Sequence, residues 1–176
     1  EGTSVFYYVK KREDFRGKRV VIAGGGDSAV DWALALEGIA AHIAVVHRRD
    51  KFRAAPDSAA KLAALAKEGR IEMVVPYQLH ALEGAGGKLS GVVVSDLDGN
   101  NRTLAADALL PFFGLSMDLG PIAGWGLALE RHHLTVNPAS CETSEAGIFA
   151  IGDVAAYPGR SEEHTSELQS LAYLVC

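Results

Sequence analysis

The sequence of 176 residues has very few cysteines and no excess of positive charge, and each shortage excludes a class of function. Its two cysteines, Cys141 and Cys176, lie far apart, so they form neither the paired spacing of a zinc site nor a disulfide framework. We therefore expect no metal site and a reducing, cytoplasmic compartment. The net charge of −5 offers no basic surface for nucleic acid, and we expect no such partner.

Long hydrophobic runs are missing as well. The most apolar stretch, residues 20–46, is interrupted by Asp27, Asp31, Glu37 and His42, whereas a membrane-spanning helix needs about 18 apolar residues in succession. We therefore expect no membrane partner. The hydrophobic share of 48% and the charged share of 22% are typical of a globular chain.

The two ends of the chain differ from its middle. The first residue is Glu1 rather than Met, so no targeting signal can be judged there. Residues 160–176 resemble the translation of a sequencing-library adapter, and we expect them to be a non-biological tail; the alternative is an ordinary polar C-terminal tail. This segment is left out of the fold prediction.

A glycine-rich segment near the start predicts a nucleotide-binding fold. Residues 18–23 are rich in β-branched side chains, as in a buried parallel strand, and a glycine-rich turn follows them. Apolar residues at helical spacing then predict a helix that ends near Gly38, and residues 41–46 predict a second strand. A strand, a turn, a helix and a strand in about 30 residues make a βαβ unit.

The turn itself fits a dinucleotide-binding fingerprint, because it reads Gly24-x-Gly26-x-x-Ala29. The first glycine allows the tight turn, the second lets the backbone approach a pyrophosphate, and the small third residue lets helix and strand pack closely. The free N–H groups and the dipole of the helix N-terminus then favour an anion. The motif alone is weak evidence, but its place between a strand and a helix favours dinucleotide binding.

The end of the second strand predicts which dinucleotide binds. An NAD site would place an Asp or Glu there, but this chain has His47, Arg48 and Arg49, with Arg53 one turn later. Two guanidinium groups facing a 2′-phosphate, at roughly 1.5 to 3 kcal/mol each, would favour NADPH over NADH by about a hundredfold or more. In the alternative, Asp50 pairs with these arginines and the segment is a solvated loop.

The rest of the chain predicts a helix, an antiparallel meander and a returning buried strand. Pro56 suits a helix start and Gly69 its end. The predicted strands are residues 71–75, 78–82, 89–95, 102–104 and 108–113. The predicted fold class is therefore α/β, with a Rossmann-like NADPH-binding domain in which a meander is inserted into the βαβ core.

Three motifs together resemble the thioredoxin-reductase-like pyridine nucleotide flavoproteins. They are the strand and glycine turn at residues 20–29, His47-Arg-Arg-Asp-x-Phe-Arg53, and Gly147-Ile-Phe-Ala-Ile-Gly-Asp153. Within that group, residues 15–18, 52–58 and 110–115 are most similar to bacterial ferredoxin-NADP reductases of the type related to thioredoxin reductase. The similarity runs over essentially all of residues 1–159.

The resemblance implies the roles of individual residues. The NADPH pyrophosphate would lie on Gly24, Gly26, Asp27, Ser28 and Ala29, and the adenosine 2′-phosphate on His47, Arg48, Arg49 and Arg53. Asp153 would accept a hydrogen bond from the ribityl chain of FAD, and Gly152 would let the backbone come close to the flavin. Without the family resemblance, the Gly152-Asp153 pair is also typical of an ordinary turn at the end of a strand.

The resemblance also implies a domain plan and partners. Residues 1–17 would be a linker from a missing FAD domain, residues 18–115 the NADPH-binding domain, and residues 116–159 the C-terminal part of an FAD-binding domain. In this family FAD takes hydride from NADPH and passes single electrons to ferredoxin or flavodoxin, and we expect a homodimer for the full-length form. No catalytic acid or base is expected, because hydride transfer is the chemistry of the cofactors.

Two alternatives stay open at this stage. Thioredoxin reductases carry a Cys-x-x-Cys pair, and this sequence has none, so it would be a flavoenzyme without the redox dithiol. Family members open with a separate FAD-binding fingerprint, and none precedes Glu1. The chain could therefore act as an isolated NADPH-binding module without turnover, or as part of a different flavoenzyme of this type. A flavin absorption spectrum of the purified chain separates a flavoprotein from such a module.

Overall fold

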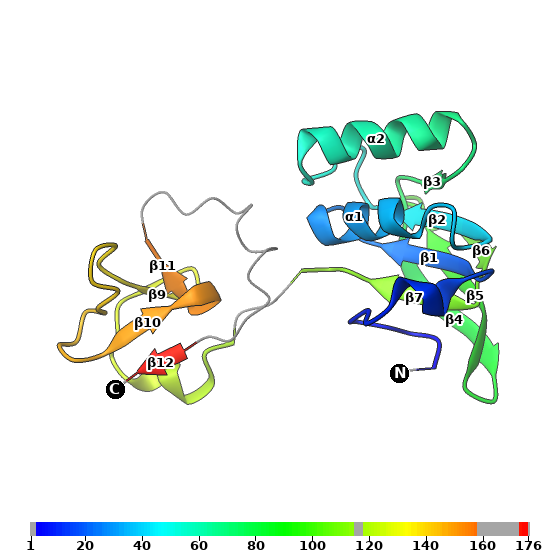
Figure 1. The fold of residues 1–176 in the computed structure, drawn as a ribbon. Coiled ribbons are helices and arrows are strands. Elements are labelled where there is room, and N and C mark those ends of the chain that lie inside the picture. Colours follow the sequence, from blue (N-terminus) through cyan, green and yellow to red (C-terminus); the bar gives the residue numbers. More distant parts are fainter. Residues whose placement is uncertain (1–2, 115–117, 158–172, 176) are drawn as a thin grey trace. The chain divides into compact units, whose positions relative to one another are not determined.

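The computed structural model describes residues 3–114, 118–157 and 173–175. The chain divides into two compact units, Glu1–Gly114 and Leu115–Cys176 (Figure 1). We call them unit 1 and unit 2 and describe each by itself.

Unit 1 is built on a four-stranded parallel sheet. Its strands are β1 (Arg19–Ala23), β2 (His42–Val46), β3 (Glu72–Val74) and β7 (Ala108–Pro111), in the order β3-β2-β1-β7. Helix α1 (Asp27–Leu36) connects β1 to β2, and α2 (Pro56–Lys67) connects β2 to β3. The structure thus confirms the predicted strand, glycine turn, helix and strand.

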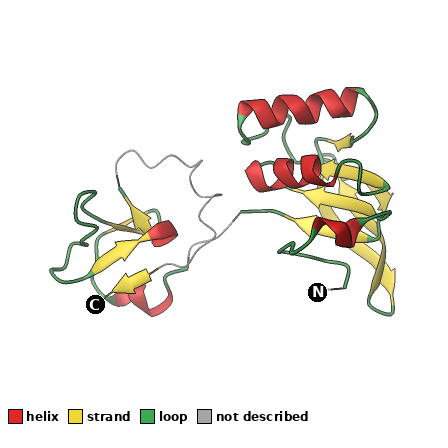
Figure 2. Cartoon of the chain, in the orientation of Figure 1, coloured by secondary structure: helices red, strands yellow, loops and turns green. Residues whose placement is uncertain are grey.

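One face of the parallel sheet packs against the helices α1 and α2, drawn in red in Figure 2, and the other face packs against a three-stranded antiparallel meander. Along β1, Val20 and Ile22 belong to a core cluster with α1 and α2, whereas Val21 and Ala23 belong to a cluster with the meander. The strand is buried on both faces for this reason, and its continuous apolar sequence follows from that double burial.

The meander consists of β4 (Gln78–Ala85), β5 (Lys88–Ser95) and β6 (Asn101–Ala105), paired antiparallel in the order β4-β5-β6. The first two strands are longer than predicted, because the turn between them uses only Gly86 and Gly87, both at positive φ. A two-residue turn of this kind suits the twist of the paired strands. Gly84, which the sequence assigns to the turn, lies within β4.

Residues 3–17, part of the predicted linker, belong to unit 1 and pack onto its sheet and core. Val5 forms a parallel bridge with Leu109, and the Phe6 N–H donates to the Leu109 carbonyl oxygen at 2.9 Å. A short 3-10 helix, η1 (Arg12–Phe15), follows and buries Phe15, whose ring contacts Phe6 edge-on at 5.3 Å between centroids. The segment therefore extends the hydrogen-bonded edge of β7 and contributes to the core.

An ion pair between Arg19 and Asp107 links the first residue of β1 to the residue before β7. The Asp107 carboxylate accepts hydrogen bonds from Arg19 Nε at 3.0 Å, from Arg19 Nη2 at 2.6 Å, and from the Arg19 backbone N–H at 2.9 Å. The hydrogen bonds from the Arg19 side chain are the main cause that lowers the pKa of Asp107 from its ordinary value of 3.8 to about 2.

We expect Asp107→Asn to lower the free energy of unfolding by about 1 kcal/mol at neutral pH, a small value because both side chains are more than one third exposed. The pKa of Asp107 is depressed in the folded chain, so this stabilisation is present above about pH 4 and is lost as the pH falls through about 2. Urea unfolding across that range measures it, with Asp98→Asn in an exposed turn as the control. A difference that stays constant down to pH 2 would contradict the expectation.

Unit 2 contains two small sheets and its own core. Strands β8 (Leu129–Glu130), β9 (His133–Thr135) and β11 (Ala155–Ala156) form one sheet, and β10 (Phe149–Ile151) pairs antiparallel with β12 (Tyr173–Val175) in the other. Two 3-10 helices, η2 (Gly120–Gly124) and η3 (Gly152–Val154), complete the unit. Its core includes Leu134, Val136 and Ala150.

The adapter-like segment, residues 160–176, lies outside the described residues apart from the backbone of β12. Its expected origin therefore stays a prediction. Within the described ranges of the chain, no helix has both the length and the apolar character needed to cross a membrane.

Candidate dinucleotide-binding site

The glycine turn joins the carboxyl end of β1 to α1. Both its backbone conformation and its close packing require a glycine at the first position. Gly24 has a φ of +155°, a conformation that L side chains rarely adopt. A Cβ atom there would also clash with the carbonyl oxygen of Phe112 and lie 3.0 Å from Cβ of Ala29. The fully buried Ala29 is therefore the small residue that close packing of strand and helix demands.

The third residue of the turn, Gly26, faces open space instead. Its φ of −94° is ordinary, and a Cβ atom placed on it would meet no other atom within 4 Å. It is the N-cap of α1, and no side chain caps this helix end. The first N–H groups of a helix have no partner inside the helix, so the turn presents free donors and open space together.

The segment after β2 folds back onto the glycine turn. The His47 imidazole lies directly against Gly25, and its ring centroid is 4.9 Å from that of Phe52. The Arg53 backbone N–H donates a hydrogen bond to the Gly25 carbonyl oxygen at 2.7 Å. The turn and the arginine-rich segment are therefore parts of one local structure. We call residues 47–55 the arginine loop.

The environment of His47 favours its neutral form. Burial is the largest cause that lowers its pKa, and the positive charges of Arg48, Arg53 and Arg49 lower it further, while a backbone hydrogen bond at Lys51 acts in the opposite direction. The three arginines thus lie close enough to act on one imidazole. The positive charge of the loop comes from the arginines, and His47 offers at most one N–H donor.

The arginines of the loop are exposed and unpaired. Within the part of the chain that the structure describes, no ion pair involves Arg48, Arg49, Arg53 or Asp50. Asp50 therefore forms no ion pair with these arginines among the described residues. Three guanidinium groups lie free beside the glycine turn, and they provide the donors that a phosphate group needs.

Two contacts of the site could not be predicted from the sequence. The Asp27 carboxylate, expected near the pyrophosphate, accepts a hydrogen bond from the Ala55 backbone N–H at 2.7 Å, and the Ser58 hydroxyl donates to Asp31 Oδ1 at 3.3 Å. Both join α1 to the start of α2 across more than 25 positions of sequence. The predicted helix start at Pro56 was the available signal, but it did not reveal the partner.

The second predicted pair, Gly152 and Asp153, lies in unit 2. Both residues belong to η3, directly after β10, and Gly152 has a φ of +78°. This positive φ explains why glycine ends the strand at that point. Both residues are half-buried.

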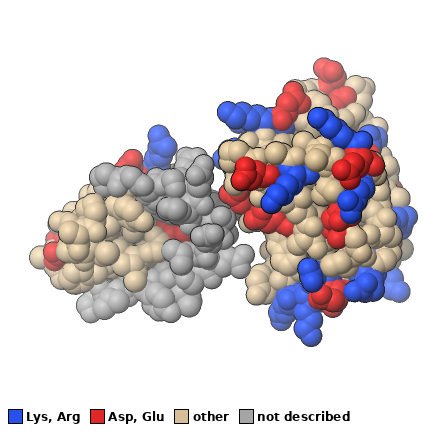
Figure 3. All heavy atoms as spheres, turned by 45° about the horizontal axis from the view of Figure 1, so that its top comes forward, with Lys and Arg blue, Asp and Glu red and all other residues tan. Residues whose placement is uncertain are grey.

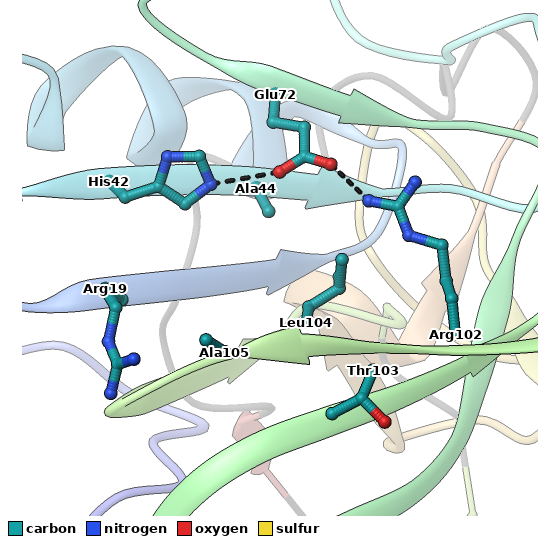
Figure 4. Close-up of a pocket in the computed structure, with 8 residues that line it drawn as sticks. All are labelled: Arg19, His42, Ala44, Glu72, Arg102, Thr103, Leu104 and Ala105. Atoms are coloured by element: carbon teal, nitrogen blue, oxygen red, sulfur yellow. Dashed lines mark hydrogen bonds and ion pairs between the residues drawn. The ribbon is translucent and has the colours of Figure 1, made fainter.

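A separate hollow of about 280 Å³ opens at the amino-terminal ends of β1 and β2, opposite the glycine turn (Figure 4). Arg19 and His42, the first residues of β1 and β2, line it, whereas dinucleotides bind at the carboxyl ends of parallel strands. Its charges are paired within the protein: Glu72 accepts a hydrogen bond from His42 Nε2 at 3.0 Å and forms an ion pair with Arg102. This hollow is lined by residues of the parallel sheet and of the meander strand β6.

The surface of unit 1 carries charges of both signs. Figure 3 shows Lys and Arg interspersed with Asp and Glu on the face it presents. Among the residues that the structure describes, no group of three or more His, Cys, Asp or Glu side chains is arranged to hold a metal ion.

Comparison with known proteins agrees with this geometry. The profile of the family described as "Pyridine nucleotide-disulphide oxidoreductase" matches residues 4–171. The chain belongs to this family. The resemblance inferred from the sequence motifs and the predicted α/β fold class are both confirmed.

Within the pyridine nucleotide-disulphide oxidoreductases, the chain is similar in sequence to ferredoxin-NADP reductases. The chain is 71% identical over 157 residues to the ferredoxin-NADP reductase of Granulibacter bethesdensis, covering 89% of this chain and 45% of the relative. It is 62% identical over 160 residues to the ferredoxin-NADP reductase of Paramagnetospirillum magneticum, covering 91% and 48%. The chain therefore spans less than half the length of these relatives.

Among solved structures, thioredoxin reductase from Lactococcus lactis superposes with a TM-score of 0.78 and 27% identity, covering 91% of this chain and 52% of that one. Thioredoxin reductase from T. acidophilum has a TM-score of 0.73 and 24% identity, covering 88% and 49%, and shows the fold alone. The fold is thus that of the thioredoxin-reductase-like members of the family.

Proposed function

We propose that this chain is the NADPH-binding half of a ferredoxin-NADP reductase, together with the C-terminal part of its FAD-binding domain. The complete protein would pass hydride from NADPH to FAD and then single electrons to ferredoxin. The observation that carries the proposal is the arginine loop, where Arg48, Arg49 and Arg53 are exposed and have no ion-pair partner among the described residues, at the place where an NAD site holds an acid. The 71% identity to a curated reductase supports it.

The two phosphate-bearing parts of NADPH would be held in different ways. The pyrophosphate would lie over Gly26 and the N-terminus of α1, where the space is open and the first N–H groups have no partner within the helix. The 2′-phosphate would lie on the guanidinium groups of the arginine loop, beside the neutral His47 ring. Ser28, half-buried in the first turn of α1, would add a hydroxyl to the pyrophosphate side.

The residues of unit 2 would serve the flavin. Asp153 would accept a hydrogen bond from the ribityl chain, and Gly152, with its positive φ, would allow the backbone to come close. FAD supplies the hydride and one-electron chemistry when it is bound in the complete protein. The chain itself positions the nucleotide and neutralises its charge, so no general acid or base is needed.

The proposal extends to partners and location. Ferredoxin is the acceptor named for the curated relatives, while flavodoxin and a homodimeric full-length form follow from the family resemblance. The scarcity of cysteine suits a cytoplasmic protein. Reduction of a disulfide through the chain's own dithiol is not proposed, because the sequence has no Cys-x-x-Cys pair and Cys141 is a free thiol.

Calorimetric titration of the chain with NADPH and with NADH tests the nucleotide assignment. We expect NADPH to bind about a hundredfold more tightly, since its extra phosphate meets at least two guanidinium groups. Equal affinities, or no binding of either nucleotide, would overturn the assignment. The reductase activity is tested separately, by NADPH-dependent reduction of ferredoxin with the full-length protein.

A further inference from the structure

The Asp27 carboxylate lies where two helices begin. Asp27 is the first residue of α1, and its Oδ1 atom accepts the Ala55 backbone N–H at 2.7 Å. Ala55 is the N-cap of α2, and no side chain caps that helix end either. A carboxylate is stabilised near a helix N-terminus by the helix dipole and by its free N–H groups, so Asp27 is well placed to bond to both elements.

This contact is one of several that hold the arginine loop on the glycine turn. The Arg53 N–H donates to the Gly25 carbonyl oxygen, the His47 ring lies against Gly25, and Ser58 donates to Asp31 just beyond the loop. The loop is therefore bound to the turn near its start and near its end. Among these contacts, the one from Asp27 is made by a charged side chain that directly follows the glycine turn.

The carboxylate of Asp27 does not suit direct phosphate binding, unlike its backbone N–H in the first turn of α1. Its carboxylate is an acceptor when ionised, and so is every oxygen of a pyrophosphate, which means that the two groups repel each other and share no hydrogen bond. Asp27 nevertheless follows directly after Gly26, the second glycine of the fingerprint, where a Cβ atom would meet only open space. The carboxylate at this point is explained by its hydrogen bond to Ala55, which holds the arginine loop in place.

We propose that Asp27 is a positioning residue, which fixes the arginine loop relative to the glycine turn so that one NADPH molecule reaches both phosphate subsites. The inference rests on the proposed function. Loss of the Asp27–Ala55 hydrogen bond should therefore weaken recognition of the 2′-phosphate more than recognition of the pyrophosphate. The measured quantity is the ratio of the NADPH and NADH affinities.

Four variants separate the hydrogen bond from the charge. Asp27→Ala removes both, whereas Asp27→Asn removes the charge and keeps an oxygen acceptor. Ala55→Pro removes the donor, and because the proline Cδ atom takes the place of the N–H hydrogen it also displaces the Asp27 carboxylate; the φ of −51° at position 55 suits proline. Asp57→Ala is the matched control, because Asp57 lies exposed in the first turn of α2 and makes no hydrogen bond or ion pair among the described residues.

We expect Asp27→Ala and Ala55→Pro to reduce the affinity ratio about tenfold, and Asp27→Asn and Asp57→Ala to keep it within about twofold. If Asp27→Ala and Ala55→Pro bind with an unchanged ratio and only melt at lower temperature, the contact is structural and the positioning role is overturned. The role is also overturned if Asp27→Asn loses the ratio as Asp27→Ala does. If the unmodified chain binds neither nucleotide, the proposed function fails and the inference fails with it.

Discussion

Replacing both Arg48 and Arg49 with alanine is expected to weaken NADPH binding about a hundredfold and to change NADH binding less than about threefold. The two guanidinium groups are exposed, lie outside the glycine turn and are not engaged by any acidic side chain among the described residues. Their removal therefore takes charge-assisted donors from the extra phosphate and leaves the pyrophosphate subsite intact. Calorimetric titration with both nucleotides at one fixed salt concentration measures the effect.

The control for this double variant removes equal charge elsewhere in unit 1. Lys61 and Lys67 are exposed on α2, outside the arginine loop, so Lys61→Ala with Lys67→Ala lowers the net charge by the same amount. That variant should keep its preference for NADPH, apart from a small loss that salt screens out. A similar loss of preference in both double variants would mean that overall charge, and not the arginine loop, selects the nucleotide.

A methyl group at position 24 should destabilise the fold, by about 3 kcal/mol for Gly24→Ala. The φ of +155° strains any L residue, and the new Cβ atom would meet the Phe112 carbonyl oxygen at the end of β7. This oxygen belongs to backbone that is itself hydrogen-bonded, because the Phe112 N–H donates to Ala23 at 2.7 Å. Neither strand end can give way easily. Urea unfolding monitored by circular dichroism measures the change.

Gly26→Ala is the matched comparison, since it adds the same methyl group two residues later. The φ of −94° accepts alanine, and no atom lies within 4 Å of the added Cβ, so the free energy of unfolding should change by less than about 1 kcal/mol. The methyl group would instead enter the space proposed for the pyrophosphate and weaken NADPH and NADH binding alike. Equal stability of the two variants would contradict the packing argument for Gly24.

The architecture of unit 1 could be predicted from local patterns because those patterns have strong physical causes. A strand buried on both faces must be apolar throughout, which is why the sequences of β1, β2 and β7 were recognisable. Glycines at positive φ, such as Gly38 and Gly69, end helices for steric reasons. The length of β4 was underestimated because Gly84 lies within the strand, at a register shift where a Cβ atom would meet the Lys88 carbonyl oxygen, and not in the turn.

Contacts between distant segments were not predictable in the same way. Nothing near Arg19 in the sequence indicates that Asp107 is its partner, and nothing near Asp27 indicates Ala55. These pairs depend on the sheet order and on where α2 begins, which are tertiary properties. The motif identified the glycines and the arginines of the candidate site, but the folded chain was needed to see that Asp27 faces the loop.

The imidazole of His47 occupies the space that the Cβ atom of any other residue at position 25 would need, and the ring of Phe52 packs beside that imidazole. Positions 25 and 47 are therefore sterically linked, although they are separated by a whole helix and strand. A mutation of Gly25 would be tolerated only after a smaller residue had replaced His47, and the order of the two steps would matter. Through this linkage the glycine turn and the arginine loop would evolve together.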